Sequence, residues 1–251
     1  MTRRILPVLL LTLFPMLAFA QVDALVQQAD SLYDLHEEQK ALEAYDRVLE
    51  QAPDHYRALW RSSLLNARVG NRQEGSAEQR EYFSRARDLA DRALQVDSTD
   101  AESNFVMAVA MGRMALISGA RDRVAASRDI KRYAQKALEI DPDHAGALHV
   151  MGRWNFRIAN LSFVERLAAN TLFGGVPGPA SNERAVELTE KAISIDGDVL
   201  LYYFDLATVY REMGMDEQAI ETCQTALKMP SRLPDDDENK RKCRELIEDL
   251  Q

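Results

Sequence analysis

The sequence predicts an all-α protein: a right-handed solenoid of about five helical hairpins, with inserted helices and a C-terminal capping helix. Two observations lead to this prediction. Small and large residues alternate with helical spacing across residues 203–230, and the same pattern recurs four times earlier in the chain. Chance apolar periodicity would hardly keep five segments in phase, so a stack of similar units is expected.

The last unit shows the pattern most clearly. Its first helix carries Tyr203, Leu206, Ala207 and Tyr210, and its second helix carries Ala219, Cys223 and Ala226. Small residues let two helix backbones approach closely, and the large ones fill the remaining space. Gly214 supplies the left-handed turn between the helices, and Pro230 ends the second one. This arrangement is typical of a tetratricopeptide repeat.

The five units are expected near residues 22–53, 56–98, 101–142, 145–197 and 200–230, with the capping helix at 235–250. The first and last have the standard length of about 34 residues. The second and third are longer by roughly ten residues and the fourth by roughly twenty, relative to that standard. We expect these extra residues between the paired helices. In the first unit, His36 occupies the position of the turn glycine.

Residues 1–20 have the composition of a secretory signal peptide. Arg3 and Arg4 precede an apolar run, and Ala18-Phe19-Ala20 forms a small-x-small cleavage site. We therefore expect a tetratricopeptide-repeat domain over residues 21–251 and a periplasmic or secreted location. An uncleaved anchor is the alternative. No later segment is apolar enough to cross a bilayer.

The charge of the chain argues against nucleic acid as a partner. Its net charge of −9 becomes −11 when the leader, which contains two of the 31 basic residues, is removed. Such a chain would be repelled by phosphate backbones. The two cysteines, Cys223 and Cys243, lie on faces that could meet; they form either a disulfide or two small buried apolar side chains.

No catalytic residues are predicted. The four histidines stand at no recognisable spacing from a nucleophile, and the chain contains no GxSxG, HExxH, Walker or CxxC motif. The glycine-rich segment 174–179 lacks the lysine of a phosphate loop. We expect no enzyme activity, no cofactor and no metal site.

The fourth unit contains the longest insertion. Leu161, Val164, Leu167, Ala168 and Leu172 recur at helical spacing before Gly174, which predicts an extra amphipathic helix. Because an apolar face exposed to solvent would be wasted, we expect this helix to pack back on the solenoid and partly cover its concave side.

Several of these segments resemble the regulator of microtubule dynamics family. The resemblance rests on Gly152-Arg153-Trp154, on the insertion from Leu161-Ser162 to Leu172-Phe173, on the long insertion before the helix of Ala86, and on Leu227-Lys228-Met229-Pro230. It covers residues 21 to the end. It implies a helical repeat fold with a binding role, at microtubules or at contacts between organelle membranes. It brings no catalytic residues.

Two functions follow as hypotheses. The first is a non-catalytic exported scaffold that binds a peptide or protein in its concave groove. The alternative is a carrier of lipid or another amphiphile, in which the insertion at 161–173 covers an apolar groove. A continuous apolar cavity would favour the carrier, and an open polar groove would favour the scaffold.

The candidate ligand-binding residues lie on the first helix of each pair, which lines the concave face. A column of arginines beside aromatic residues could hold an anionic group with an apolar neighbour. The competing interpretation is structural, because arginine is also favoured near a helix C-terminus. The candidates are Arg68, Arg113, Arg153, Arg157, Trp60, Phe105, His149, Phe156 and Phe204.

Overall fold

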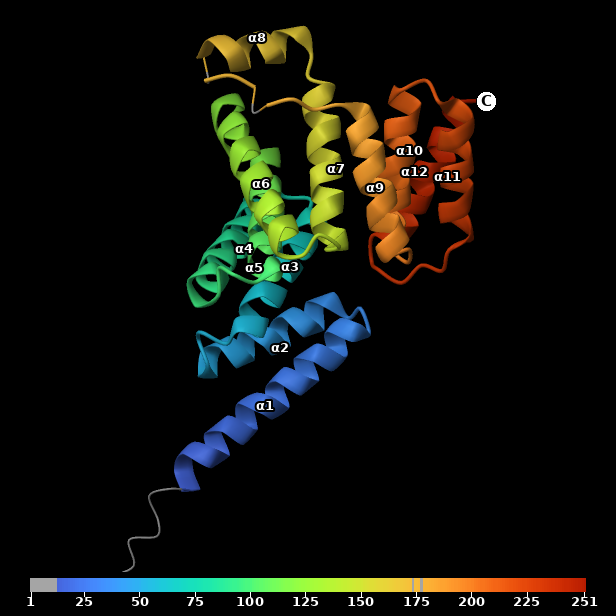
Figure 1. The fold of residues 1–251 in the computed structure, drawn as a ribbon. Coiled ribbons are helices and arrows are strands. Elements are labelled where there is room, and N and C mark those ends of the chain that lie inside the picture. Colours follow the sequence, from blue (N-terminus) through green and yellow to red (C-terminus); the bar gives the residue numbers. More distant parts are fainter. Residues whose placement is uncertain (1–12, 173, 177) are drawn as a thin grey trace, which may run out of the picture.

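In the computed structural model, residues 13–172, 174–176 and 178–251 are described, and this part of the chain contains twelve α-helices and no β-strand (Figure 1). In chain order the helices are α1 (Leu13–Asp34), α2 (Glu38–Gln51), α3 (Tyr56–Asn71), α4 (Ser76–Val96), α5 (Ala101–Leu116), α6 (Ala120–Ile140), α7 (Ala145–Ala159), α8 (Phe163–Leu172), α9 (Asn182–Ile195), α10 (Leu200–Glu212), α11 (Asp216–Lys228) and α12 (Asp236–Asp249).

Ten of the helices pack as five hairpins. The partners are α1 with α2, α3 with α4, α5 with α6, α7 with α9, and α10 with α11. Helix α8 is inserted between α7 and α9, and α12 packs on both α10 and α11. The predicted all-α helical solenoid is therefore confirmed.

The predicted leader lies partly outside the described residues, which begin inside it at the first turn of α1. Its cleavage and the resulting location stay predictions. Within the described part of the chain, no helix combines the length and hydropathy needed to cross a bilayer.

Two histidines cap the first helix of a hairpin through the same kind of hydrogen bond. The Nδ1 atom of His55 accepts a hydrogen bond from the backbone N–H of Ala58 at 3.3 Å, and Nδ1 of His144 accepts one from Ala147 at 3.1 Å. Each ring satisfies an amide in the first turn that has no partner within the helix. Both histidines therefore act as N-caps of α3 and α7.

The hairpin turns of the first and last units share one backbone conformation. His36 has φ 59° and Gly214 has φ 70°, so both lie in the left-handed region. Glycine adopts this conformation without strain, whereas a residue with a side chain does so only at some cost. His36 therefore takes the place of the turn glycine.

The extra residues of the second and third units do not form inserted loops or helices. The connections after α3 and α5 are short, and α4 and α6 are each 21 residues long, compared with 14 for α2 and α9. The early part of both long helices contains good helix formers and no glycine or proline, so the second helix simply begins earlier. The expectation of inserted helices was wrong for these two units.

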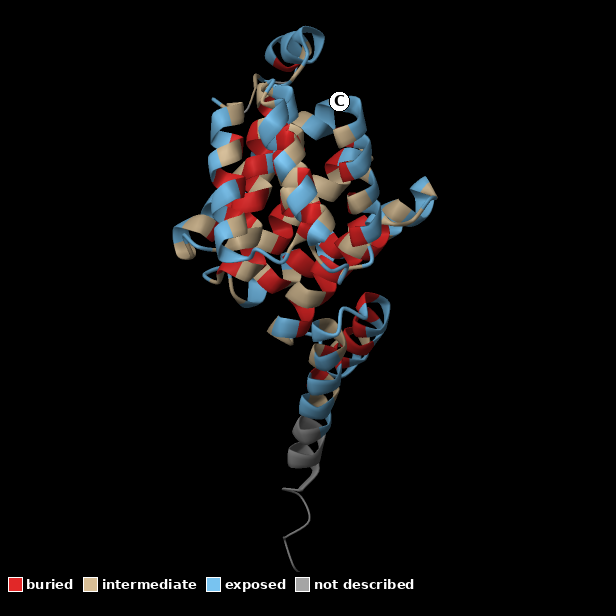
Figure 2. Cartoon of the chain, turned by 90° about the vertical axis from the view of Figure 1, so that its right-hand side faces the viewer, coloured by how far each residue is buried: buried red, intermediate tan, exposed pale blue. Residues whose placement is uncertain are grey.

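The core follows the line where paired helices meet (Figure 2). Alanines at the closest approaches are completely buried, among them Ala41, Ala86, Ala134 and Ala207. At Gly152, a Cβ atom would lie 2.4 Å from Oγ1 of Thr189 on α9. Only glycine allows α7 and α9 to pack at this distance.

The capping helix buries the two cysteines together. Cys223 of α11 and Cys243 of α12 are fully buried in one cluster with Leu246, and both are free thiols in this structure. The hydrogen bond with Cys243, followed by burial, raises the pKa of the Cys223 thiol. Formation of a disulfide between them stays a prediction.

Candidate ligand-binding groove

The inner wall of the solenoid consists of first helices. Helix α3 contacts α5, α5 contacts α7, and α7 contacts α10, so side chains on one face of these helices share a continuous surface. In stacked helical repeats this surface is the concave one. Side chains near the ends of these helices meet there with the start of α2 and the start of α12.

Eight of these residues form a network that we name the inner cluster. They are Glu38, Arg68, Arg72, Arg113, His149, Arg153, Asp205 and Asp235. Four arginines face three carboxylates. The cluster therefore has a local excess of positive charge, in a chain whose net charge is negative.

Glu38 joins the first hairpin to the second. Its side chain is only 4% exposed, and its carboxylate lies 3.1 Å from Nη1 of Arg68 and 2.7 Å from Nη2 of Arg72. Glu38 is the first residue of α2, two residues after the left-handed turn at His36. Its carboxylate neutralises both guanidinium groups in part.

His149 and Asp205 form a buried pair between α7 and α10. Nε2 of His149 lies 2.7 Å from Oδ2 of Asp205, and the imidazole stacks on Tyr202 with ring centroids 4.3 Å apart. Burial lowers the pKa of His149, against the opposing effect of Asp205. Burial alone would raise the pKa of Asp205, but Arg153, His149 and Arg113 lower it overall. At neutral pH the pair is therefore a neutral imidazole and a carboxylate.

One ion pair of the inner cluster joins two residues that are far apart in the sequence. Arg72, just after α3, lies 3.5 Å from Asp235, just before α12, although 163 residues separate them. The solenoid thus curls far enough for the start of its cap to reach its second unit. The neighbouring Asp236 has a different role, because it accepts hydrogen bonds from the backbone N–H groups of Arg232 and Leu233 at 2.8 Å.

Arg113 lies close enough to several other charged members of the inner cluster to interact with them. Its Nη1 donates to the amide oxygen of Asn71 at 2.7 Å, and none of the ion pairs formed within the described part of the chain includes it. Burial, followed by repulsion from Arg153, lowers the pKa of Arg113 to about 10, although Asp235 and Asp205 act in the opposite direction. Arg113 remains charged at neutral pH, and the excess positive charge of the cluster lies with it.

The structure brings some of the predicted site residues together and places others apart. Arg68, Arg113, Arg153 and His149 come together in the inner cluster. Arg157 does not, because it lies at the C-terminal end of α7, close to Glu165 of α8.

The aromatic candidates serve mainly as packing residues. Trp60 and Phe105 lie against the same core cluster around Leu64 and Val106. Phe204 packs on the last core cluster, with Nζ of Lys242 5.8 Å from its ring centroid. Phe156 is half-buried near the end of α7. The aromatic residue that contacts the inner cluster is Tyr202, through the ring of His149.

Sequence reasoning missed the acidic half of the cluster. Glu38 lies two residues after the His36 turn, but nothing in the sequence pointed to its two arginine partners. Asp235 stands in a run of four acids at the start of the capping helix, a common composition at a helix N-terminus. Asp205 carried no signal, because it is one acid among many on helix surfaces.

The insertion in the fourth unit forms the predicted extra helix, and it packs back on the solenoid as expected, but the expectation that its apolar face would be buried was wrong. Phe163, Val164, Leu167 and Leu172 are 80%, 72%, 51% and 72% exposed, and Ala169 is the buried residue of α8. Helix α8 lies across one end of the solenoid, above α6 (Figure 1). Small residues face the protein here, and large apolar ones face outward.

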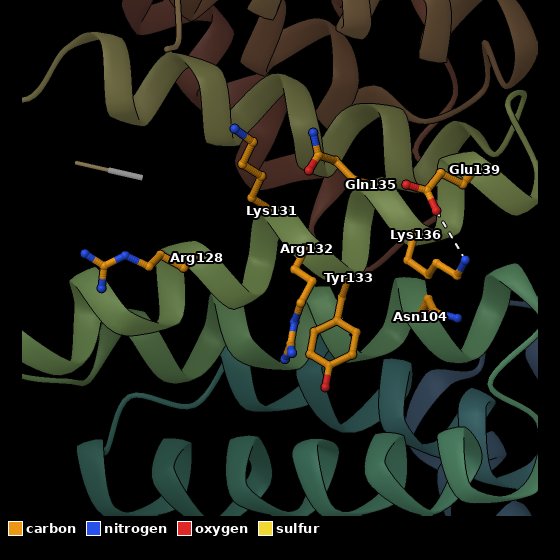
Figure 3. A pocket seen from close by; sticks show the side chains of 8 residues that line it. All are labelled: Asn104, Arg128, Lys131, Arg132, Tyr133, Gln135, Lys136 and Glu139. Atoms are coloured by element: carbon orange, nitrogen blue, oxygen red, sulfur yellow. Dashed lines mark hydrogen bonds and ion pairs between the residues drawn. The ribbon is translucent and has the colours of Figure 1, made fainter. Parts of the chain in front are cut away.

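A hollow lies along α6, away from the inner cluster. It has a volume of about 620 Å³ and is lined by Asn104, Arg128, Lys131, Arg132, Tyr133, Gln135, Lys136 and Glu139 (Figure 3). Its basic side chains are engaged within the protein: Arg132 pairs with Asp129 at 2.9 Å, and Lys136 pairs with Glu139 at 3.2 Å. We therefore assign no ligand to this hollow. No group of side chains suited to hold a metal ion occurs within the described residues.

The stacked hairpins and their inner wall define a tetratricopeptide-repeat solenoid. The crystal structure of a thermophilic tetratricopeptide-repeat protein of Thermus thermophilus superimposes with a TM-score of 0.66 at 14% identity, covering 90% of this chain and 98% of that one. This likeness shows the fold.

The chain belongs to the Regulator of microtubule dynamics protein 1-3 family, whose model matches residues 25–251. Regulator of microtubule dynamics protein 3 of Xenopus laevis is 23% identical over 90% of this chain and 50% of its own length. Regulator of microtubule dynamics protein 1 of Bos taurus is 25% identical over 70% of this chain and 55% of its own length. The family predicted from the sequence is thus confirmed, and the chain spans about half the length of these relatives.

Proposed function

We propose that this protein is a non-catalytic scaffold that binds a protein or peptide in its concave groove, with an anionic group of the ligand against Arg113. The observation that carries the proposal is the charge of the inner cluster. Arg113 is held among other arginines without a carboxylate partner in the described residues. A ligand carboxylate would supply the missing charge and form charge-assisted hydrogen bonds with the guanidinium.

The partner class is argued from the repeat fold and from the charge of the inner wall. Stacked helical repeats commonly bind extended segments along their concave surface. The inner wall is charged, which favours a polar segment over an apolar chain. The leader predicted at residues 1–20 supports the further proposal that binding takes place in the periplasm or outside the cell.

The alternative function is a carrier of lipid or another amphiphile, and the same experiment distinguishes it from the scaffold. It requires the insertion at 161–173 to cover an apolar groove, and the outward-facing apolar side chains of α8 lend that arrangement no support. Microtubule dynamics appear in the names of the relatives. Because this chain matches about half their length, we do not carry that activity over.

The proposal is tested by selection from a pool of random eight-residue peptides with free carboxyl termini. Immobilised protein is incubated with the pool, and mass spectrometry identifies what is retained. We expect retained peptides to be enriched in Asp and Glu. The Arg113→Gln variant should lose this enrichment, whereas Arg47→Gln, a change at an exposed position on α2, should keep it.

Two results would contradict the proposal. Retention of the same peptides by Arg113→Gln would remove Arg113 from the site. Retention of no peptides, together with a lipid found in the protein purified without delipidation, would support the carrier instead.

A further inference from the structure

Helix α8 presents an apolar face to solvent at one end of the molecule. Phe163, Val164 and Leu167 lie on one side of this helix by their spacing, and they are 80%, 72% and 51% exposed. We name these three residues the α8 face. Exposed large apolar groups that adjoin one another mark an interaction site more often than single ones do.

The helix is held firmly on its opposite side. Ala169 is buried, and Nη2 of Arg166 donates to the carbonyl of Ala159 at the end of α7 at 3.2 Å. Arg128 of α6 donates to the carbonyl of Gly175 at 2.8 Å, and the N–H of Gly175 donates to Ala169 at the same distance. These contacts fix α8 to the solenoid, so its apolar face points outward by construction.

The helix start is also well formed. The Oγ atom of Ser162 accepts from the N–H of Glu165 at 3.2 Å, and Oε2 of Glu165 accepts from the N–H of Ser162 at 2.9 Å. This reciprocal pair is a capping box, which stabilises the first turn of a helix. The α8 face is therefore presented by an ordered helix.

Two arginines lie near the start of α8, where Phe163 and Val164 are exposed. Hydrogen bonds from Ser162 lower the pKa of Glu165, and the charges of Arg157 and Arg123 lower it further, which places both arginines close to the start of α8. Two arginines thus lie near a carboxylate that is already engaged with Ser162, in a chain whose net charge is −9.

We propose that the α8 face docks on an anionic lipid surface. A helix that projects from the end of a molecule, with large apolar side chains outward and arginines beside them, fits the boundary between headgroups and acyl chains. Phe163 and its neighbours enter that boundary, and the arginines meet lipid phosphates. A second copy of the chain is a poorer occupant, because two such surfaces would bring arginines opposite arginines.

The proposal is tested with the full chain and two kinds of vesicle, one of phosphatidylcholine alone and one that also contains phosphatidylglycerol. In flotation, the wild-type protein should bind the anionic vesicles, and added salt should weaken the binding. The double variant Phe163→Ser/Leu167→Ser should reduce the partition coefficient at least about tenfold.

The matched control changes two apolar residues of comparable exposure elsewhere. Leu35 and Val96 are 68% and 45% exposed, so Leu35→Ser/Val96→Ser should bind as the wild type does. A second measurement tests whether Phe163 itself contacts the lipid. Tryptophan fluorescence of Phe163→Trp should be quenched by brominated anionic lipid beyond the quenching of the wild-type protein.

Several outcomes would overturn the proposal: equal flotation of the Phe163→Ser/Leu167→Ser variant, equal binding to both kinds of vesicle, or no added quenching in Phe163→Trp. A dimer in solution that the double variant abolishes would replace the membrane by a second copy. Because Arg113→Gln leaves the α8 face intact, it should float normally, which separates this test from that of the peptide groove.

Discussion

The imidazole of His149 on α7 lies 2.7 Å from the carboxylate of Asp205 on α10, so a buried histidine and a largely buried aspartate link the first helices of successive hairpins. Nη1 of Arg153 lies 3.4 Å from the same carboxylate oxygen. Protonation of His149 would add a charge beside two arginines, since Arg113 also acts on this histidine.

We predict that His149 makes the fold less stable as the pH falls from 7 towards 5. Its pKa is lower in the folded protein than the ordinary value of about 6.5. The unfolded chain therefore binds more protons in this window, and the free energy of unfolding decreases on acidification. Urea unfolding at several pH values should give a smaller decrease for His149→Gln than for the wild type.

His144 does not confound this comparison. Although burial acts in the opposite direction, the hydrogen bond to Glu102 raises the pKa of His144 overall, so its contribution is present at low pH and is lost as the pH rises. It is common to both proteins and cancels in the difference. An equal pH dependence of the two proteins would refute the role of His149.

A pair of glycines tests the packing of α7 on α9. A Cβ atom at Gly152 would meet Oγ1 of Thr189 at 2.4 Å, whereas one at Gly112 would meet no atom within 4 Å. We expect Gly152→Ala to lower the free energy of unfolding by about 1–3 kcal/mol through overpacking. Gly112→Ala, also inside a helix, should raise it by about 0.5–1 kcal/mol. Equal melting temperatures of the two variants would show that the close approach is not required.

Two adjacent glutamates test the link between the first two hairpins. Glu38 is buried between Arg68 and Arg72, and Glu37 is 48% exposed beside Lys40. Glu38→Gln leaves two arginines short of a carboxylate, and we expect a loss of about 1–2 kcal/mol, since both remain partly hydrated. Glu37→Gln should change the stability by less than about 0.5 kcal/mol. A loss of equal size in both variants, measured by urea unfolding, would argue against a structural role of Glu38.

The sequence was informative wherever one helix contacts its nearest neighbours. The spacing of residues such as Ala207 and Ala219 predicts the hairpins, because local packing repeats with the chain. The inner cluster could be predicted only in part. Arg68 and Arg113 share a helix position, but the contact of Arg72 with Asp235 depends on how far the whole solenoid curls. That curvature accumulates from small rotations between units, which apolar periodicity does not specify.

The prediction of how α8 packs was wrong for another reason. Its apolar spacing predicts a helix, but periodicity does not say which side of the helix meets the protein. Ala169 and the contacts of Arg166 turn the small side inward, so Phe163 and Leu167 are left outside. Burial was assumed because most amphipathic helices are buried on their apolar side.

The central claim, that an anionic ligand binds against Arg113, is tested most directly by NMR of the arginine side chains. Protein labelled with ¹⁵N in arginine is titrated with an acidic octapeptide that has a free carboxyl terminus. The Nε–Hε signal of Arg113 should shift with the binding curve, while that of Arg47 stays in place. An unmoved Arg113 signal at saturation, or a shift confined to Arg123 and Arg157 beside α8, would contradict the account.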